Sequence, residues 1–261
     1  MNGQAKGLLS SDPLLIFMHL PKTAGSSLRS VFRAIYGEQK MHAYSPMKDL
    51  LNDNLQAFTK VHDEAIYKCN DQASIQLIYG HLFYGIDSEI TRKCTYTTMM
   101  RDPVDRVLSN YYYRLQYGHC VNPVVNLIDY VSGNSPSYAM QFEADNLQTR
   151  FLSAMDGKPR RVAFGKCTNE MLACAKRNLA DAVSAVGIVE RYDESLALFQ
   201  RSYKWSFIPR NPKERVTAPY VPKNETPRGT LSIIQEINCL DIDLYKFGIQ
   251  LFEQQLRRAA L

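Results

Sequence analysis

The loop over residues 21–27 combines side chains that are suited to binding an anion. One lysine supplies a mobile cation, and one threonine and two serines supply hydroxyl donors. The candidate anion-binding residues of this loop are Lys22, Thr23, Ala24, Gly25, Ser26 and Ser27. The loop lacks the Gly-x-x-x-x-Gly-Lys-Ser/Thr pattern, which excludes the phosphate loop of nucleoside triphosphatases.

The residues on either side of this loop predict a strand and a helix. An apolar run of strand length begins at Leu14. After the loop, Leu28, Val31, Phe32 and Ile35 recur at the spacing of one helical face. The first N–H groups of a helix have no internal partner and favour negative charge, so this arrangement predicts an anion site. The alternative is an ordinary turn in which Ser26 or Ser27 only caps the helix.

A second candidate site follows residues 94–100, which are rich in β-forming side chains. Arg101 at the end of this expected strand can hold a phosphate through two parallel hydrogen bonds. Pro103 suits the first position of a helix, and Ser109 on that helix can offer its hydroxyl to the same anion. The alternative is a surface salt bridge of Arg101.

His81 is the candidate general base. It follows an expected strand over residues 75–79. Histidine suits proton transfer because its ordinary pKa lies near neutrality. The alternative is a structural histidine whose hydrogen bonds are satisfied within the fold.

The order of expected elements predicts an α/β fold with a mainly parallel sheet covered by helices on both faces. A further strand is expected at 185–189, and helices are expected at 138–152, at 170–179, after a cap at Asp193, and from about Asp243. Residues 37–60 read as a loosely helical connection, 118–136 as a loop with a short helix, and 208–229 as an irregular surface loop. Ligands bind at the carboxyl ends of such strands, so one rim should collect Lys22, His81 and Arg101.

Composition narrows the class of protein. The 261 residues suit a single domain over 1–261, with 45% apolar residues, 22% charged residues and a net charge of +5. This mild positive charge suits an anionic ligand, and no basic run supports nucleic-acid binding. The six cysteines form no Cys-x-x-Cys pair, so we expect reduced thiols and no metal site. No segment is long and apolar enough for a membrane span.

Two of these motifs resemble those of sulfotransferases that use 3′-phosphoadenosine-5′-phosphosulfate (PAPS). Residues 21–27 are similar to the loop that binds the 5′-phosphosulfate. Residues 101–113 resemble the motif in which an Arg, and a Ser eight positions later, hold the 3′-phosphate. The resemblance runs over about residues 14–254 and is closest to the carbohydrate branch, typified by heparan and chondroitin 2-O-sulfotransferases. It implies the sulfotransferase fold, with a P-loop-like strand, loop and helix.

The resemblance also implies a role for each site residue. Residues 23–27 would hold the 5′-phosphate, and Lys22 would stabilise charge on the transferred group. His81 would take the proton of an acceptor hydroxyl, belonging to a glycan or another small alcohol. The 3′-phosphate would be held by Arg101 and Ser109, with a basic loop contributing Lys223, Asn224 and Arg228. No metal is required.

Two positions depart from the 2-O pattern. His19 and Tyr79 stand where the 2-O enzymes have an arginine and a histidine that face the acceptor. Weaker likenesses extend over residues 145–152, near the acceptor cleft of that family, and over 186–192. Golgi carbohydrate sulfotransferases carry a membrane anchor. Because this sequence contains no such apolar segment, the chain is expected to be a cytoplasmic relative or a shortened form. The alternative functions are a P-loop-type small-molecule kinase and a non-catalytic nucleotide- or glycan-binding protein of the same fold.

Overall fold

A five-stranded parallel sheet forms the centre of the computed structural model, which describes residues 13–44, 67, 70, 74–118, 125–153, 162–209 and 220–260. The strand order is β2-β3-β1-β4-β5. The strands are β1 (Leu14–Met18), β2 (Met41–Tyr44), β3 (Leu77–Gly80), β4 (Cys94–Met100) and β5 (Val183–Ile188). All five residues of β1 are buried, as a central strand covered on both faces requires. The expected α/β fold with a parallel sheet is therefore confirmed.

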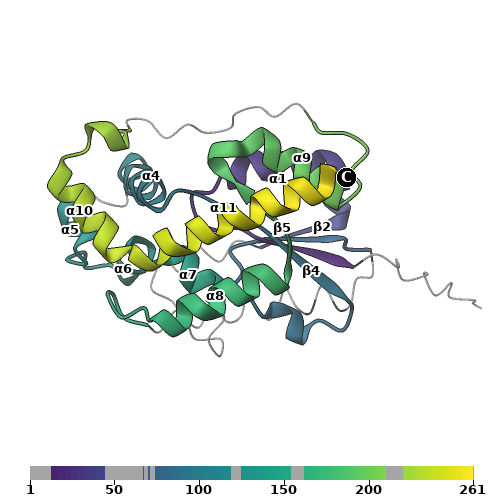
Figure 1. The fold of residues 1–261 in the computed structure, drawn as a ribbon, viewed down its shortest axis with the longest axis horizontal. Helices are drawn as coiled ribbons and strands as arrows, with labels where there is room; N and C mark the ends of the chain where they lie inside the picture. The colour runs from purple at the N-terminus through teal and green to yellow at the C-terminus, as the bar shows by residue number, and fades with distance from the viewer. Residues whose placement is uncertain are drawn as a thin grey trace, which may run out of the picture.

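Helices cover both faces of this sheet (Figure 1). The α-helices are α1 (Gly25–Tyr36), α4 (Pro103–Gln116), α5 (Leu127–Val131), α6 (Tyr138–Ala144), α7 (Leu147–Ser153), α8 (Asn169–Asp181), α9 (Tyr192–Ser202), α10 (Arg228–Ile237) and α11 (Cys239–Ala260). Short 3₁₀ turns lie at η1 (Glu38–Lys40), η2 (Ile86–Glu89), η5 (Val189–Arg191) and η6 (Lys223–Glu225). Helices α1 and α9 lie on one face and α8 on the other, while α11 runs along β5.

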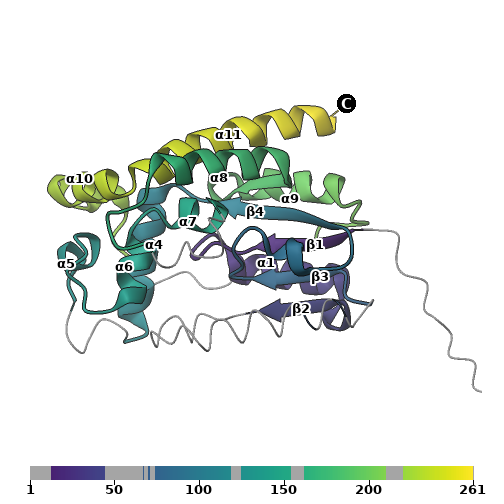
Figure 2. The same ribbon diagram turned by 90° about the horizontal axis from the view of Figure 1, so that it is seen from below.

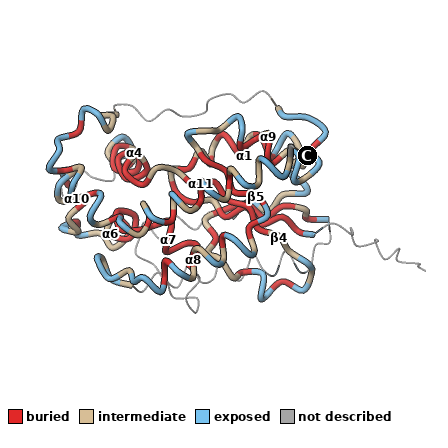
Figure 3. The backbone as a smooth tube through the Cα atoms, viewed as in Figure 1, coloured by how far each residue is buried: buried red, intermediate tan, exposed pale blue. Residues whose placement is uncertain are grey.

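A second apolar cluster lies beyond the carboxyl ends of the strands. Helices α4, α5, α6 and α10 gather there (Figure 2), and their buried side chains include Val107, Tyr130 and Ile234. Burial is concentrated in the sheet and on the inner sides of these helices (Figure 3). A separate helical layer thus lies next to the carboxyl rim of the sheet.

Two expected elements are wrong in type or extent. Part of the connection expected over residues 37–60 is the strand β2, which pairs with β3 from Met41 opposite Leu77. The helix expected over 138–152 is two helices, because the chain breaks at Asp145 and Asn146, where Asn146 has a φ of 44°. An edge strand of four residues carries too short a pattern to stand out in the sequence.

Two further expectations concern the carboxyl-terminal half. Asp193 does not cap α9, because Arg191 occupies that position and Asp193 lies in the first turn. The surface loop expected over 208–229 contains η6 and the beginning of α10, and residues 210–219 lie outside the described residues. The final helix begins at Cys239, earlier than expected.

The sequence predicts reduced thiols, no metal site and no membrane span, and the described residues provide an observation on each. Cys94, Cys167, Cys174 and Cys239 are free thiols, while Cys69 and Cys120 lie outside the described residues. Within those ranges no group of three or more His, Cys, Asp and Glu side chains is placed to hold a metal ion. None of the described helices has the length and apolar character needed to cross a bilayer. The cytoplasmic location stays a prediction.

Candidate active site

The loop between β1 and α1 has an unusual backbone conformation. Lys22 and Ala24 have φ values of 70° and 61°, in the left-handed region that non-glycine residues rarely adopt. The Thr23 hydroxyl donates to the Leu20 carbonyl over 2.8 Å, and the Thr23 N–H donates to the same oxygen over 3.3 Å. Both donors of Thr23 therefore shape the loop from within. Turns of this kind direct main-chain N–H groups into a concavity that favours anions.

Helix α1 begins without a side-chain cap. Ala24 occupies the capping position, and no acidic side chain lies in the first turn. Ser26 and Ser27 lie inside the helix, so the interpretation of either serine as its cap is wrong. The unpaired N–H groups and the helix dipole therefore leave this end suited to an anion, with two hydroxyl groups beside it.

Arg101 connects the two motifs. One guanidinium nitrogen, Nη1, donates to the Lys22 carbonyl over 3.1 Å. The Gln148 side chain from α7 accepts from the Arg101 N–H over 3.1 Å and donates to the Arg101 carbonyl over 3.0 Å. Gln148 thus fixes the backbone from which Arg101 reaches the loop.

Helix α4 connects Lys22 of the loop with the second motif. The Lys22 Nζ atom lies 4.1 Å from the centroid of the Tyr113 ring, a cation–π contact with α4. Ser109 is one helical turn before Tyr113 on α4, and its side chain is buried. Helix α4 therefore carries both the serine of the second motif and the ring that the lysine of the first motif contacts.

His81 lies just beyond the end of β3 and contacts the start of the loop. Its Nδ1 atom lies 2.8 Å from the His19 carbonyl oxygen, and the two imidazole rings stack with centroids 4.4 Å apart. Burial lowers the pKa of His81 to about 4, against smaller opposing effects of that hydrogen bond and of Glu143. The imidazole is consequently neutral at pH 7, the form that a general base requires. The expectation that one rim collects Lys22, His81 and Arg101 is confirmed.

His19 and Tyr79 are directed toward the loop. The Tyr79 hydroxyl donates to the Gly25 carbonyl over 2.6 Å and lies 3.5 Å from His19 Nδ1. A Cβ atom added at Gly25 would lie 1.8 Å from His19 Nε2, so only glycine leaves room for this ring. Both side chains therefore pack against the first residue of α1.

The carboxyl-terminal basic loop reaches the same end of the sheet. Lys223 Nζ lies 3.2 Å from both carboxylate oxygens of Asp102, whose Oδ1 atom caps α4. Asn224 and Arg228 are exposed. Lys223 thus lies beside the neighbour of Arg101, paired with a carboxylate. Contacts of these three residues with a nucleotide stay a prediction.

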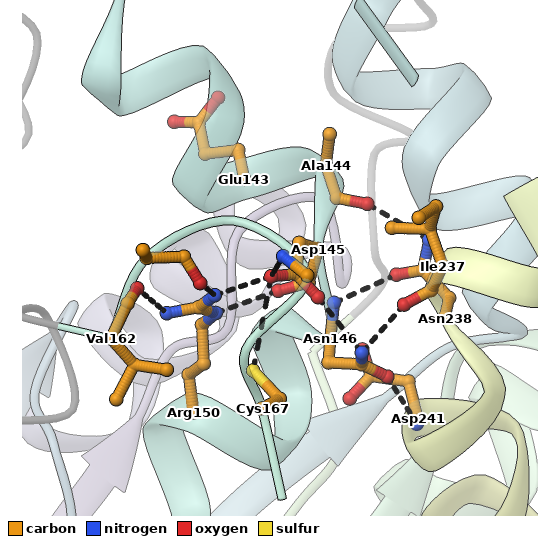
Figure 4. Close-up of polar contacts among 12 residues, drawn as sticks. Glu143, Ala144, Asp145, Asn146, Arg150, Val162, Cys167, Ile237, Asn238 and Asp241 are labelled. Atoms are coloured by element: carbon orange, nitrogen blue, oxygen red, sulfur yellow. Dashed lines mark hydrogen bonds and ion pairs between the residues drawn. The ribbon is translucent and has the colours of Figure 1, made fainter. Parts of the chain in front are cut away.

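A buried polar network that the sequence did not predict supports this arrangement (Figure 4). The Asp145 and Arg150 side chains form an ion pair that is fully buried. The Asp241 carboxylate accepts from the N–H groups of Gln148 and Thr149, over 3.0 and 2.7 Å. Asn146 joins the two parts, because its side-chain oxygen accepts from the Asp241 N–H over 3.0 Å. The available signal was the density of polar residues over 145–150 within an otherwise apolar pattern.

Comparison with known proteins agrees with this geometry. Residues 8–158 match the model of a family described as "Sulfotransferase family". The chain is 28% identical over 198 residues to "Heparin sulfate O-sulfotransferase" from Drosophila melanogaster, covering 68% of this chain and 54% of that protein. It is 25% identical over 194 residues to "Heparan-sulfate 6-O-sulfotransferase 1" from Homo sapiens, covering 63% of this chain and 44% of that protein.

These comparisons support the carbohydrate branch, but they do not single out the 2-O enzymes. A third relative, "Heparan-sulfate 6-O-sulfotransferase 1-B" from Danio rerio, is 26% identical over 194 residues. The chain spans about half the length of the curated relatives it matches. The family model covers more than half of the chain, including both motifs that meet at the carboxyl rim of the sheet. This chain therefore belongs to the sulfotransferase family.

Proposed function

We propose that this protein transfers a sulfuryl group from PAPS to the hydroxyl group of a glycan or another small alcohol. The hydrogen bond from Arg101 to the Lys22 carbonyl carries the proposal, because it unites the two nucleotide-binding motifs beside the uncapped end of α1. The family match and the relatives named for heparan sulfate support the reaction class and the glycan acceptor.

Each residue acts on a definite part of the reaction. The first turn of α1, with Ser26 and Ser27, binds the 5′-phosphate, while Arg101 and Ser109 anchor the 3′-phosphate. His81 accepts the acceptor's hydroxyl proton as the new oxygen–sulfur bond forms and the bond from sulfur to the phosphate oxygen breaks. Lys22 stabilises the negative charge that develops on the leaving oxygen. The leaving group is already a phosphate, so these residues suffice without a metal.

The position of the acceptor hydroxyl is the finer part of this proposal. His19 and Tyr79 pack against Gly25, and we propose that they do not supply the acceptor contacts that the 2-O pattern implies. Incubation with sulfur-labelled PAPS and selectively desulfated heparan chains would locate the label at the 2-O or 6-O position. Labelling of small alcohols alone would exclude the glycan as acceptor and leave the sulfotransferase reaction with a small alcohol.

The nucleotide preference provides the first test. We expect 3′-phosphoadenosine 5′-phosphate to raise the melting temperature far more than AMP or ATP with Mg²⁺, because only the first ligand carries a 3′-phosphate. Saturation at 100 times Kd stabilises a protein by about 2.7 kcal/mol. A thermal-shift titration measures this. Equal shifts with AMP would refute a 3′-phosphate site, and a larger shift with ATP and Mg²⁺ would favour the kinase alternative.

Arg101→Ala tests that 3′-phosphate site. Loss of a charge-assisted contact should cost about 1.5–3 kcal/mol of nucleotide binding, or about 10- to 150-fold in Kd by calorimetry. The matched control is Arg33→Ala, which removes an exposed arginine of α1 that pairs with Glu38 at 2.9 Å. The control should bind normally. An Arg101→Ala protein that does not fold would instead assign Arg101 a structural role through its contact with the loop.

A further inference from the structure

The hydrogen bond between His81 and His19 determines which nitrogen of His81 carries a proton. A carbonyl oxygen can only accept, so the Nδ1 atom that lies 2.8 Å from the His19 carbonyl must be the donor. In the neutral ring the other nitrogen, Nε2, is then unprotonated. His81 is therefore held in the tautomer whose Nε2 atom can accept a proton.

The Tyr79 hydroxyl constrains the tautomer of His19 by the same reasoning. The Tyr79 hydroxyl donates its proton to the Gly25 carbonyl over 2.6 Å, so its oxygen is left as an acceptor. His19 Nδ1 lies 3.5 Å from that oxygen, at the outer limit of a hydrogen bond, and must donate if the two groups interact. His19 Nε2 is then an unprotonated nitrogen. In the structure this Nε2 atom is buried without a hydrogen-bond partner among the described residues.

The environment keeps the His19 ring neutral. Burial lowers its pKa well below the ordinary value, and the neighbouring His81 and Lys22 act in the same direction. The His19 Nε2 atom is buried and lies against Gly25. The ring is therefore placed to support the neighbouring imidazole.

We propose that Tyr79 and His19 are positioning residues that link the first residue of α1, Gly25, to the orientation of the His81 base, whose tautomer is set by the main-chain carbonyl of His19. The contacts run from the Gly25 carbonyl to the Tyr79 hydroxyl, then to His19 Nδ1, and from the His19 carbonyl to His81 Nδ1. Stacking of Tyr79 on His19, with centroids 5.5 Å apart, and of His19 on His81 at 4.4 Å holds the rings in register. The catalytic consequence rests on the proposed function.

This link connects the two halves of the site through a short path. Gly25 begins the helix end that is suited to the 5′-phosphate, and His81 is the base for the acceptor. Movement of the loop at Gly25 would be transmitted to the imidazole of His81 through only two side chains. The site can thereby couple the geometry of the base to the geometry of the loop.

The tautomers can be measured without any enzymatic assay. In wild-type protein labelled with nitrogen-15 at histidine, long-range correlation spectra at pH 7 should show both His19 and His81 protonated at Nδ1. An Nε2-protonated His81 would overturn the proposal whether or not the protein transfers a sulfuryl group. The wild-type spectrum decides this point even if a variant does not fold.

Tyr79→Phe tests the link from the loop. The ring stack remains and the hydroxyl is lost, so the His19 spectrum should shift toward protonation at Nε2. Turnover should fall about 3- to 10-fold with unchanged nucleotide affinity, which is the effect of one hydrogen bond. The matched control is Tyr36→Phe. It removes a hydroxyl that accepts from Trp205 Nε1 over 3.0 Å at the other end of α1.

The outcomes separate this proposal from the proposed function. An unchanged His19 tautomer and wild-type turnover in Tyr79→Phe would overturn the link. Absence of sulfuryl transfer by the wild-type protein to every acceptor would refute the proposed function alone, because the spectra of both proteins still report the tautomers. Equal effects in Tyr36→Phe would show that any lost hydroxyl of this helix region has the same consequence, and would also overturn the link.

Discussion

Replacing His81 with alanine is expected to lower turnover by roughly 10²–10⁴-fold, the usual effect of losing a general base. Nucleotide affinity should remain near that of the wild type, because the described contacts of His81 are with His19 and not with the anion-binding loop residues Ser26 and Ser27. Steady-state kinetics on a verified acceptor and calorimetry with 3′-phosphoadenosine 5′-phosphate measure the two quantities separately.

The pH profile identifies the titrating group. His81 acts as a base only when it is unprotonated, so kcat/KM should fall as the pH drops through the pKa of His81 in the free enzyme. Burial places this pKa at about 4, so the acid limb should lie well below the ordinary histidine value of about 6.5. The residual activity of His81→Ala should lack this limb.

A second histidine provides the control. His42→Ala removes an imidazole from β2, the edge strand that β3 separates from β1. It should retain turnover and the acid limb. Full activity of His81→Ala on an acceptor that the wild-type protein sulfates would remove His81 from the mechanism.

Lys22→Ala is expected to reduce turnover by about 10²–10³-fold, the range found when one preorganised donor to developing charge is removed. Lys22 also interacts with the negative charge of the bound nucleotide in the ground state. Nucleotide affinity should therefore fall in Lys22→Ala and stay unchanged in His81→Ala. The two variants should therefore differ in Kd more than in kcat. Single-turnover kinetics with saturating PAPS separates the chemical step from binding.

The control for Lys22 is another lysine that contacts an aromatic ring. Lys176 is on α8, and its Nζ atom lies 5.8 Å from the Phe247 ring centroid and 3.1 Å from the Asp243 carboxylate. Lys176→Ala should leave both constants unchanged. Tyr113→Phe keeps the ring over which Lys22 lies and should retain most activity. Normal turnover in Lys22→Ala would contradict its role in stabilising the transition state.

Local patterns were sufficient for the parts of the site that are continuous in the chain. The strand β1 was predicted correctly from the apolar run at Leu14, and the loop from its small residues. The helix α1 was predicted correctly from the apolar helical face that begins at Leu28. The same holds for α4, because Pro103 is a direct signal of a helix start, and the structure adds Asp102 as the cap. Parallel strands then require that Lys22, His81 and Arg101 meet at one rim.

The tertiary structure alone decided how these residues are held. Gln148 holds Arg101 across 47 positions, and Tyr79 reaches Gly25 across 54 positions, so no local period records either contact. Strand β2 exists because β3 supplies its hydrogen bonds, and the break at Asn146 persists because Asn238 and Asp241 satisfy its polar groups. Local sequence determines which groups are present, whereas long-range hydrogen bonding and burial determine their tautomer, charge and direction.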